Sequence, residues 1–488
     1  MAIDAREQST GPANGVFHPV SINVTEHLKK QEAFYNALPD NSTWASRHYR
    51  KLLARYYRFL VPADASILEV GCGGGELLAL LANRDVTGID PSERQVKRAQ
   101  QRLPHGVFVK QAGELLQMDR TFDFIILSDT INLAADVQAI FERLHSVAHS
   151  KTRLILNFHS NLWRPFLAVA KLLGLQTRHP ASNWLTLNDV KNLLLLGEWE
   201  FLRAESRILV PLPMAGLDSV ANRFLAPVMP IFCLSVFAIA RPKQVGRKVD
   251  YSVSVIVPAR NEAGNIRAAV SRLPVLGNGT ELLFIEGGSR DDTWEEIQRV
   301  IHENPNRCIR ALRQSGTGKG NAVREAFEAA GGEILMILDA DLTMPPEELP
   351  KYYRAVASGK AEVANGVRLV YPMDAEAMQF FNLCANKLFS VVFSWLLGQP
   401  IKDTLCGTKV LFKCDYLKIA ANRHYFGDFD PFGDFDLLFG AGRLNLKLVD
   451  IPVRYEGRSY GTTNIQRWRH GALLLRMVLV AMRKLKFI

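Results

Sequence analysis

Short apolar runs and longer amphipathic stretches alternate along the whole chain. Two segments begin in the same way, with an apolar run, then glycine or small polar residues, then a helical pattern. They are "SILEVGCGGGELLALLA" from Ser66 and "YSVSVIVPARNEAGNIRAAV" from Tyr251. Because strand and helix patterns keep alternating through both halves, the sequence predicts an α/β fold with helices on both faces of each sheet.

The stretch between these two segments has the composition of a linker. "RPKQVGRKVD", residues 241–250, is polar, basic and short. A chain of 488 residues is also too long for one ordinary core, so two domains of roughly 200 to 250 residues are expected. The predicted parts are a flexible leader at 1–30, a first domain at 31–243, a linker at 244–250 and a second domain at 251–488.

Composition restricts the partners more than it restricts the fold. A hydrophobic content of 48% and a charged content of 22% are typical of a globular chain. The net charge of +10 favours anionic partners such as nucleotides, nucleic acid or a membrane surface. The six cysteines show no C-x-x-C pair or zinc spacing, which is typical of a reducing cytosol, and no signal peptide is predicted at the N-terminus.

One uncharged run raises the question of a membrane span. It extends from Phe224 to Ala240 and contains Pro227 and Pro230. A spanning helix needs about 20 apolar residues, so this run is too short and too rich in proline. We expect it to form a buried strand and a turn, and the sequence predicts no transmembrane segment.

The first domain carries a glycine-rich loop between a predicted strand and a predicted helix. In "ILEVGCGGGELL", the loop residues are Glu69, Gly71, Gly73 and Gly75. Glycines at this place let the backbone approach a ligand closely, and a helix N-terminus offers free N–H groups. About twenty residues later, "VTGID" ends a second strand on Asp90, where a carboxylate can bind two ribose hydroxyls. The spacing alone is also compatible with a dinucleotide.

This E-x-G-x-G-x-G pattern, with "FDFIILSDTINL" as a fourth strand and loop, resembles the class I S-adenosylmethionine-dependent methyltransferases. The resemblance implies S-adenosylmethionine as the cofactor. The family often carries an adenine-contacting aspartate where this chain has Ala112, and Glu114 is the candidate substitute. A hydroxyl acceptor would need a base, for which Asp129 and His159 are candidates. The alternatives are a loop cap for Asp129 and a surface position for His159.

The second domain contains "RQSGTGKGNAVR", which looks like a phosphate-binding loop but fails its pattern. A P-loop needs glycine where Arg313 stands and a hydroxyl where Gly320 stands. Further on, "EILMILDADL" delivers Asp339 and Asp341 at the tip of a predicted strand. Alternate strand residues share a face, so both carboxylates can reach one Mg²⁺ or Mn²⁺ ion that bridges a diphosphate.

The order V-P-x-x-N-E, G-x-S-x-D-x-T, G-K-G-x-A-x-R and D-A-D over residues 252–343 resembles the family 2 glycosyltransferases of GT-A fold, in their dolichyl-phosphate mannosyltransferase-like branch. The resemblance implies inverting transfer from a nucleotide-sugar, with Asp339 and Asp341 on the metal. The implied donor-binding residues are Pro258, Asn261, Glu262, Glu286, Lys319, Asp339, Arg368 and Lys409. This chain departs from the family's D-D-G-S motif, because Glu286 and Gly287 replace its two aspartates. The identity of the donor is therefore left open.

The acceptor side is assigned by the same resemblance. "IKDTLCGTKVLF" matches a D-x-x-C-G-x-K element that contains Asp403, and "FGDFDPFGDFD" concentrates four aspartates, two of which are Asp434 and Asp436. These three are the catalytic candidates, and "RSYGTTN" at 458–464 resembles the loop that closes over the donor. A lipid phosphate acceptor, with a second pKa of about 6, would need no base, whereas a sugar hydroxyl would.

The C-terminal residues predict a helix with one basic stripe. Arg469, Arg476 and Arg483 recur every seven residues, and Lys486 follows one turn later. A basic stripe on an otherwise apolar helix suits the interface of an anionic membrane, and the alternative is a core helix with solvated arginines. No motif supports nucleic acid as a partner. The protein is therefore expected in the cytoplasm, peripheral on the inner face of the membrane.

Together these patterns predict a bifunctional enzyme. It would combine S-adenosylmethionine-dependent methyl transfer with inverting, metal-dependent glycosyl transfer, from a nucleotide-sugar to a polyprenyl phosphate or a related cell-envelope glycan. One alternative is a glycosyltransferase whose N-terminal domain is a non-catalytic binding or docking module. A second alternative is a glycosyltransferase that acts on a soluble acceptor.

Overall fold

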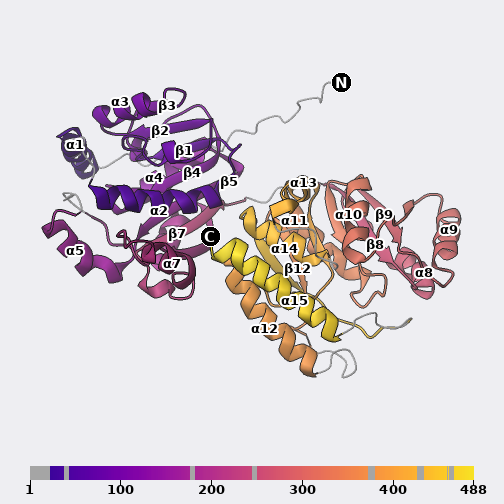
Figure 1. Ribbon diagram of the computed structural model, residues 1–488. Helices are drawn as coiled ribbons and strands as arrows, with labels where there is room; N and C mark the ends of the chain where they lie inside the picture. The colour runs from indigo at the N-terminus through magenta and orange to yellow at the C-terminus, as the bar shows by residue number, and fades with distance from the viewer. Residues whose placement is uncertain are drawn as a thin grey trace. The chain divides into compact units, whose positions relative to one another are not determined.

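The chain divides into two compact units, Met1–Lys243 and Gln244–Ile488, and each is described by itself (Figure 1). The computed structural model describes residues 22–37, 43–175, 182–244, 250–371, 380–425, 433–458, 460 and 467–488. Most of the predicted leader and linker lies outside these residues. The end of the predicted leader is helical, because helix α1 spans Ile22–Ala37 and Lys110 holds Glu32 of this helix in an ion pair of 2.6 Å.

The first unit is built on a mixed seven-stranded sheet with the order β3-β2-β1-β4-β5-β7-β6. Strands β1 to β5 run parallel to one another, and β7 is antiparallel to both β5 and β6. The strands are β1 (Ile67–Val70), β2 (Val86–Asp90), β3 (Val107–Lys110), β4 (Phe122–Ser128), β5 (Ala148–His159), β6 (Trp199–Arg207) and β7 (Ser235–Pro242).

Amphipathic helices cover this sheet. The largest, α2 (Trp44–Leu60), begins at Thr43, whose hydroxyl accepts a hydrogen bond from the Ser46 backbone N–H at 3.1 Å. Its apolar side, which includes Leu53 and Tyr57, is buried. The other helices are α3 (Glu93–Arg102), α4 (Val137–Arg143), α5 (Arg164–Leu172), α6 (Leu187–Leu196) and α7 (Leu217–Val220).

The prediction of a helix directly after the glycine loop is wrong. Between β1 and β2 the chain forms only a short 3₁₀ turn, Leu78–Leu80. Gly71, Gly73 and Gly75 all have positive φ angles, which an α-helix does not allow, so the chain turns repeatedly through this loop. The loop therefore cannot offer the N–H groups of a helix N-terminus, and a ligand must use the loop backbone itself.

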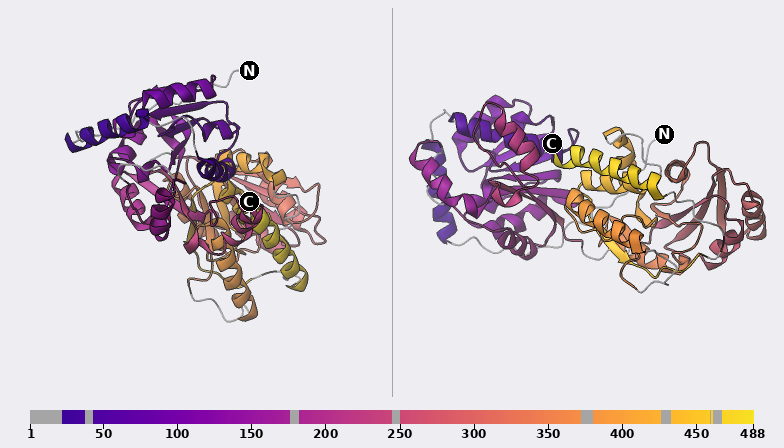
Figure 2. Two further views of the ribbon diagram at one scale, coloured as in Figure 1. Left: turned by 60° about the vertical axis from the view of Figure 1, so that its left-hand side comes forward. Right: turned by 60° about the horizontal axis from the view of Figure 1, so that its bottom comes forward.

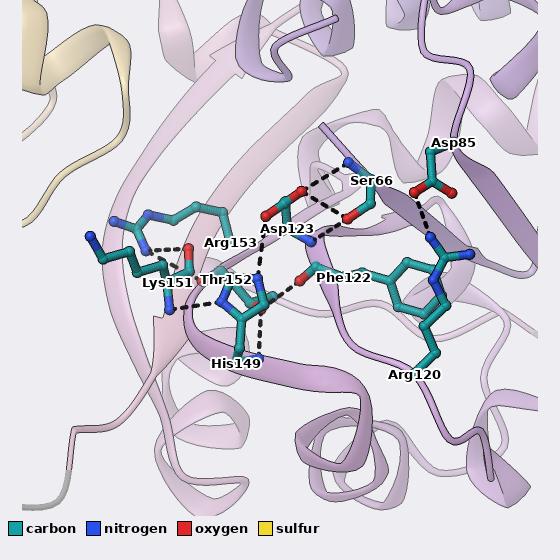
Figure 3. A network of polar contacts seen from close by, with 9 residues as sticks. All are labelled: Ser66, Asp85, Arg120, Phe122, Asp123, His149, Lys151, Thr152 and Arg153. Carbon is teal, nitrogen blue, oxygen red and sulfur yellow. Dashed lines mark hydrogen bonds and ion pairs between the residues drawn. The ribbon is translucent and has the colours of Figure 1, made fainter. Parts of the chain in front are cut away.

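The opposite end of this sheet is fastened by a polar network (Figure 3). The Asp123 carboxylate accepts hydrogen bonds from the backbone N–H and the hydroxyl of Ser66, at 3.0 and 2.8 Å, and His149 lies 3.3 Å from it. Partial burial alone would raise the pKa of Asp123, but the hydrogen bonds from Ser66 lower it. The Thr152 hydroxyl donates to the Phe122 carbonyl at 2.6 Å. These contacts fix the register of β1, β4 and β5 at the end away from the glycine loop.

The second unit also has a mixed seven-stranded sheet, with the order β10-β9-β8-β11-β13-β12-β14. Strand β13 is antiparallel to its neighbours β11 and β12, and the other pairs are parallel. The strands are β8 (Ser252–Ala259), β9 (Gly279–Glu286), β10 (Cys308–Arg313), β11 (Ile334–Ile337), β12 (Val363–Val367), β13 (Lys409–Phe412) and β14 (Leu448–Pro452). The expected α/β class is confirmed for both units.

Eight α-helices of this unit lie within the described residues. Helices α12 and α15 lie side by side in every view of Figures 1 and 2. The helices are α8 (Ala263–Arg272), α9 (Thr293–Glu303), α10 (Lys319–Ala329), α11 (Leu349–Ala357), α12 (Phe380–Leu397), α13 (Lys413–Ala421), α14 (Asp434–Arg443) and α15 (Arg467–Ala481). Among the described residues, none of the chain's helices has the length and apolar character needed to cross a bilayer.

The uncharged run from Phe224 to Ala240 is only partly buried. Its second part forms β7, as expected for a buried strand. Its first part is exposed instead: the exposed fraction is 64% for Val228 and 76% for Ile231. The predicted strand is thus β7, and the first part contains the turn, at residues 226–228, whose neighbouring apolar side chains do not reach the core.

Candidate functional site

The glycine loop of the first unit borders a pocket with a volume of about 530 Å³. The predicted cofactor-binding residues that line it are Glu69, Gly71, Gly73, Asp90 and Glu114. The remaining one, Gly75, packs instead against α3, since a Cβ atom there would lie 3.2 Å from the Ala99 side chain. The structure thus gathers five of the six predicted residues around one cavity.

Asp90, at the end of β2, holds the loop through its carboxylate. One oxygen accepts the backbone N–H of Gly73 at 2.9 Å, and the other accepts that of Ser92 at 2.9 Å. Burial raises the pKa of Asp90 to about 6 in spite of these bonds. A Cβ atom at Gly73 would meet only the Glu76 carboxylate, at 3.7 Å, so the space beside this backbone is open to a ligand.

Glu69, the last-but-one residue of β1, is the least satisfied charged group of the pocket. The residue is 3% exposed, and within the described part of the chain its Oε2 atom has no hydrogen-bond partner. Burial, together with the nearby carboxylates of Glu76 and Asp90, raises its pKa well above the ordinary value. A buried acceptor without a partner is costly, so a ligand that carries positive charge or donors fits this place.

Ala112 and Glu114 lie in the wall of the pocket but do different things. Ala112 has no side chain that could bond a ligand, and it precedes a short 3₁₀ turn, Gly113–Leu115. The Glu114 carboxylate accepts the backbone N–H groups of Ala135 and Asp136, at 2.9 and 3.4 Å. In this arrangement Glu114 supports the loop after β4, and its role toward adenine stays a prediction.

The two base candidates, Asp129 and His159, are brought together in the pocket wall. The Asp129 carboxylate lies 3.5 Å from Nε2 of His159, and it accepts hydrogen bonds from Asn157 at 2.6 Å and from the Tyr49 hydroxyl at 3.2 Å. The side chain of His159 is only 15% exposed, so His159 is not a surface residue. Sequence reasoning missed Tyr49, which stands on the otherwise apolar inner side of α2.

Asp129 also has an unusual backbone. Its φ angle is +57°, in the left-handed region that is uncommon for residues other than glycine. The conformation places its carboxylate beside Asn157 and Tyr49 instead of capping the loop, since no side-chain cap bond forms there. Such strain is found in functional sites more often than elsewhere, which favours a role in the pocket.

In the second unit, the Asp339 carboxylate holds the Lys319 ammonium at 2.6 Å. Partial burial alone would raise the pKa of Asp339, but Lys319 lowers it. Gly407 lies directly against this pair, because a Cβ atom there would come within 2.7 Å of both carboxylate oxygens. We call residues 314–320, which carry Lys319 at the start of α10, the lysine loop. The D-x-x-C-G-x-K element therefore meets the lysine loop at Asp339, and only glycine leaves room for the contact.

Asp341 holds a different cation. Its Oδ2 accepts a hydrogen bond from Arg458 at 2.7 Å, and Arg458 also reaches Glu262 at 3.2 Å. Strand β11 ends at Ile337, so both aspartates lie in the turn after the strand. The argument that they share one face of a strand is therefore wrong, although both remain at the carboxyl end of β11.

The other predicted donor residues surround the ends of β8 and β9. Pro258 pairs with Ile285 inside the sheet. Asn261 has a φ angle of +58° and accepts the Arg290 backbone N–H at 2.8 Å, which ties the two loops together. Burial raises the pKa of Glu262, whose carboxylate accepts the Asn265 amide at 2.7 Å.

Glu286 and Lys409, two more predicted donor residues, are both buried. Glu286 ends β9, and its carboxylate accepts the backbone N–H of Ser289. The Lys409 ammonium donates to the Cys406 carbonyl. Both side chains therefore have partners inside the protein, and contact between either one and a donor stays a prediction.

Asp403, a predicted catalytic residue, is fully buried and satisfied. Arg368 donates two side-chain hydrogen bonds to it, at 2.7 and 3.0 Å, and Asn386 donates a third at 2.9 Å. Burial alone would raise the pKa of Asp403, but the Arg368 guanidinium lowers it to about 2. In this conformation Asp403 positions Arg368, and its action as a base stays a prediction.

The remaining catalytic candidates belong to the start of α14. The Asp436 carboxylate accepts a hydrogen bond from Arg423 at 2.7 Å, a partner that sequence reasoning missed. Asp434 is the first residue of α14, and its side chain lies outside the described residues. Gly433 just before it packs on Gly320, where a Cβ atom would lie 2.8 Å from the Gly320 Cα. The backbone at Asp434 thus lies next to the lysine loop.

Asp339 and Asp341 are the predicted ligands of a divalent metal ion. Within the described ranges, no group of three or more His, Cys, Asp or Glu side chains gathers closely enough to hold a metal ion. Asp339 and Asp341 nevertheless offer hard carboxylate oxygens that already bind cations, namely Lys319 and Arg458. Two carboxylates suit Mg²⁺ or Mn²⁺ when phosphate oxygens supply further ligands.

In both units, predicted site residues such as Asp90 and Asp339 lie at or just beyond the carboxyl ends of parallel strands, where open α/β sheets commonly bind ligands. Residues 63–186 match the family model for a methyltransferase domain, and residues 254–418 match that for glycosyl transferase family 2. The chain contains a methyltransferase domain and a family 2 glycosyltransferase domain, and the predicted resemblance is confirmed for both.

Comparison with individual proteins extends this finding. The chain is 33% identical to dolichol-phosphate mannosyltransferase of Pyrococcus furiosus over 221 residues, 44% of this chain and 59% of that protein. It is 24% identical to an undecaprenyl-phosphate 4-deoxy-4-formamido-L-arabinose transferase of Enterobacter sp., over 43% of this chain and 62% of that protein. The chain thus spans about three fifths of the length of these curated relatives.

Among solved structures, an S-adenosylmethionine-dependent methyltransferase of Thermotoga maritima has 18% identity and a TM-score of 0.32, over 41% of this chain and 93% of that chain.

Proposed function

We propose that the protein is a bifunctional enzyme that transfers a sugar from a nucleotide-sugar to a polyprenyl phosphate and a methyl group from S-adenosylmethionine. One observation supports the proposed glycosyl transfer. Asp339 and Asp341 lie at one sheet edge, and each already holds a flexible cationic side chain, Lys319 or Arg458. This is the charge set that binding of a metal ion and a diphosphate requires.

Charge balance describes how this edge would work. Mg²⁺ or Mn²⁺, held by Asp339 and Asp341, would neutralise negative charge on the leaving diphosphate. The two carboxylates would then no longer need Lys319 and Arg458, whose side chains become available to the phosphates. Arg368 would remain in place because Asp403 fixes it through two hydrogen bonds. These residues bind and orient the donor so that the acceptor attacks from the opposite face.

Two facts favour a lipid phosphate as the acceptor. The relatives named above are transferases for dolichol phosphate and undecaprenyl phosphate. A phosphate is already largely dianionic at neutral pH and needs no base, which agrees with the engagement of Asp403 and Asp436 by arginines. Such an acceptor implies that the protein works at the inner face of a membrane. Arg476 and Arg483 at the C-terminus would contribute to that contact.

In the first unit, Gly73 and Asp90 would bind the cofactor's polar groups, and Glu69 would face its positive charge. The sulfonium is already an activated leaving group, so correct positioning supplies most of the rate. A hydroxyl acceptor would meet His159, which takes the proton, while Asp129 and Tyr49 hold the imidazole in place. This arrangement favours an oxygen nucleophile as the methyl acceptor.

The proposal is tested with the purified full chain. Labelled sugar should pass from a panel of nucleotide-sugars to a polyprenyl phosphate only when Mg²⁺ or Mn²⁺ is added, and not to soluble saccharides. Calorimetric titration with S-adenosylmethionine should give one site per chain. Transfer to soluble saccharides alone would establish the soluble-acceptor alternative.

The other alternative, a non-catalytic N-terminal module, rests on Ala112. The family often carries an adenine-contacting aspartate at this position, and this chain has alanine instead. The Glu114 carboxylate already accepts hydrogen bonds from two backbone N–H groups. If the module binds no cofactor, titration with S-adenosylmethionine gives neither heat nor a thermal shift, while sugar transfer persists.

A further inference from the structure

Two segments of the first unit leave its sheet at the same edge. Residues 160–175 follow β5, and residues 208–234 connect β6 to β7. His159 at the end of β5 pairs with Ser235 at the start of β7, so the two segments begin as neighbours. They also stay in contact, because the Trp163 indole N–H donates to the Phe232 carbonyl at 2.8 Å. Figure 1 shows α5 and α7, which belong to these segments, at the lower border of this unit.

These segments expose an unusual amount of apolar side chain. Residues 160–175 contain five large apolar side chains that are exposed, and residues 208–234 contain ten. The most exposed are Ile231 at 76%, Leu172 at 73% and Leu173 at 69%. Single exposed leucines are common on protein surfaces, but a continuous group of this size marks an interaction surface. We call residues 160–175 and 208–234 the apolar surface.

The charges of the apolar surface are positive. Arg164, Lys171 and Arg223 are its basic residues, and Asp218 is its only acidic one. Asp218 is 6% exposed and is turned inward, where it accepts the Met214 backbone N–H at 3.0 Å. Apolar side chains with a basic margin complement an anionic lipid bilayer. A second copy of this chain would instead bring like charges together.

The apolar surface continues into the cofactor pocket. Leu167 and Lys171 of α5 line that pocket, together with His159 and Glu69. Helix α5 therefore belongs both to the apolar surface and to the wall of the pocket.

We propose that the apolar surface lies in the interface of an anionic bilayer and that the methyl acceptor is a hydroxyl-bearing amphiphile taken from that bilayer. The inference rests on the methyl transfer proposed above. In the reaction, the acceptor oxygen bonds to the methyl carbon as the sulfur–carbon bond breaks. The electron pair of that bond stays on sulfur, and the hydroxyl proton passes to His159. The bilayer then retains the methylated amphiphile.

The test compares two double variants of the full chain. Leu172→Glu with Ile231→Glu places charge in the apolar surface, and Leu195→Glu with Leu196→Glu does so on α6. The α6 residues are also exposed, at 61% and 51%, but lie outside the apolar surface. Co-sedimentation uses vesicles of phosphatidylglycerol and phosphatidylcholine. The first variant should bind at least about tenfold more weakly than wild type, and the α6 variant should bind like wild type.

Further measurements separate this inference from the proposed function. Both variants should bind S-adenosylmethionine as wild type does, which also shows that they fold. With tritiated S-adenosylmethionine and a total lipid extract, wild type should place label in the organic phase, and the Leu172/Ile231 variant should lose most of it. The inference is overturned if that variant sediments like wild type, if it only changes the oligomeric state, or if label stays in the aqueous phase. Absence of cofactor binding in wild type would overturn the proposed methyl transfer, whatever the vesicles show.

Discussion

Glu69 and Asp90 in the first site and Asp339 and Asp403 in the second are carboxylates with different kinds of partner. In the first unit, Asp90 accepts only backbone N–H groups, and one oxygen of Glu69 has no partner. In the second unit, two buried or partly buried carboxylates hold a cationic side chain instead, since Asp339 holds Lys319 and Asp403 holds Arg368. Both sites lie at the carboxyl ends of parallel strands, so the difference does not come from the fold.

This difference matches the charge of the ligand that each site is proposed to bind. A ligand with its own positive charge can satisfy a carboxylate that the protein has left open, as Glu69 is. A metal ion bound to a diphosphate carries both positive and negative charge. In the absence of this ligand, the acidic and basic side chains of its site can therefore pair with one another. Lys319 on Asp339 and Arg458 on Asp341 are such pairs.

The largest effect is expected for Asp339→Asn. The change removes the charge that would hold the metal ion and leaves Lys319 without its partner, so sugar transfer should fall by about 10³-fold or more. Binding of S-adenosylmethionine should not change. Asp250→Asn, an exposed aspartate of the same unit, is the matched control. Metal-dependent transfer at the wild-type rate would contradict the assignment of Asp339.

Asp403→Asn should mainly destabilise the second unit. It leaves the Arg368 guanidinium buried with one neutral partner, which costs about 3–5 kcal/mol in the free energy of unfolding. Because the pKa of Asp403 is depressed from 3.8 to about 2, its contribution is present above pH 4 and is lost as the pH falls toward 2. Urea unfolding of wild type and variant at pH 7 and pH 3 measures the difference, which should shrink at pH 3.

The same variant separates a positioning role of Asp403 from a catalytic one. If Asp403 only positions Arg368, Arg368→Met combined with Asp403→Leu should recover part of the stability without recovering sugar transfer. If Asp403 is the base, Asp403→Asn should abolish turnover under conditions in which circular dichroism shows the protein folded and the donor still binds.

Gly73→Val should weaken cofactor binding by about 100-fold. The φ angle of Gly73 is +52°, which a β-branched residue rarely adopts, and the new side chain would occupy the open space beside the loop. Calorimetry with S-adenosylmethionine measures the loss. Gly216→Val is the control, because Gly216 also has a positive φ and open surroundings but does not line the pocket. Equal affinity in both variants would contradict the glycine-loop assignment.

The sequence predicted the framework of both sites because strand ends and glycine loops are local features. Glu69 and Asp90 lie at the strand ends where the pattern placed them, and Asp339 follows the end of β11 by two residues. The helix expected after Gly75 was not found, because the positive φ angles of the loop glycines cannot be read from their spacing.

Partners from distant parts of the chain were beyond sequence reasoning. Tyr49 meets Asp129 across 80 residues, and Arg458 meets Asp341 across 117. Such pairs depend on tertiary packing, which a local pattern does not contain. The same limit explains Lys486, which was assigned to the basic stripe but is 5% exposed and lies 5.7 Å from the centre of the Trp395 ring.

Without Lys486, the predicted basic stripe is expected to contribute less to membrane binding. Arg476 and Arg483 are exposed, whereas the Arg469 side chain lies outside the described residues. Each exposed basic residue near an anionic bilayer contributes about 1 kcal/mol. Arg476→Gln with Arg483→Gln should therefore weaken binding to phosphatidylglycerol vesicles by roughly 30-fold at low salt, and much less at high salt. Lys486→Gln is the control and should leave the salt dependence unchanged.

The smallest effect, and the most direct test of the comparison, is expected for Glu69→Gln. Because burial and two neighbouring carboxylates raise the pKa of Glu69, its ionised form costs stability, and the cost grows as the pH rises above the ordinary value of 4.5. The neutral variant should therefore melt about 2–4 °C higher than wild type at pH 8, which corresponds to about 1 kcal/mol, and less so at pH 5. Its affinity for S-adenosylmethionine should fall by about tenfold, because the ligand's positive charge loses its partner.

Glu76→Gln provides a control of opposite sign. Burial alone would raise the pKa of Glu76, but Arg50 and Arg102 lower it, so this variant should melt below wild type at pH 8. Thermal melts with and without cofactor at both pH values measure all of these changes. If Glu69→Gln is destabilised at pH 8 as Glu76→Gln is, Glu69 is already paired, and the contrast between the two sites does not hold.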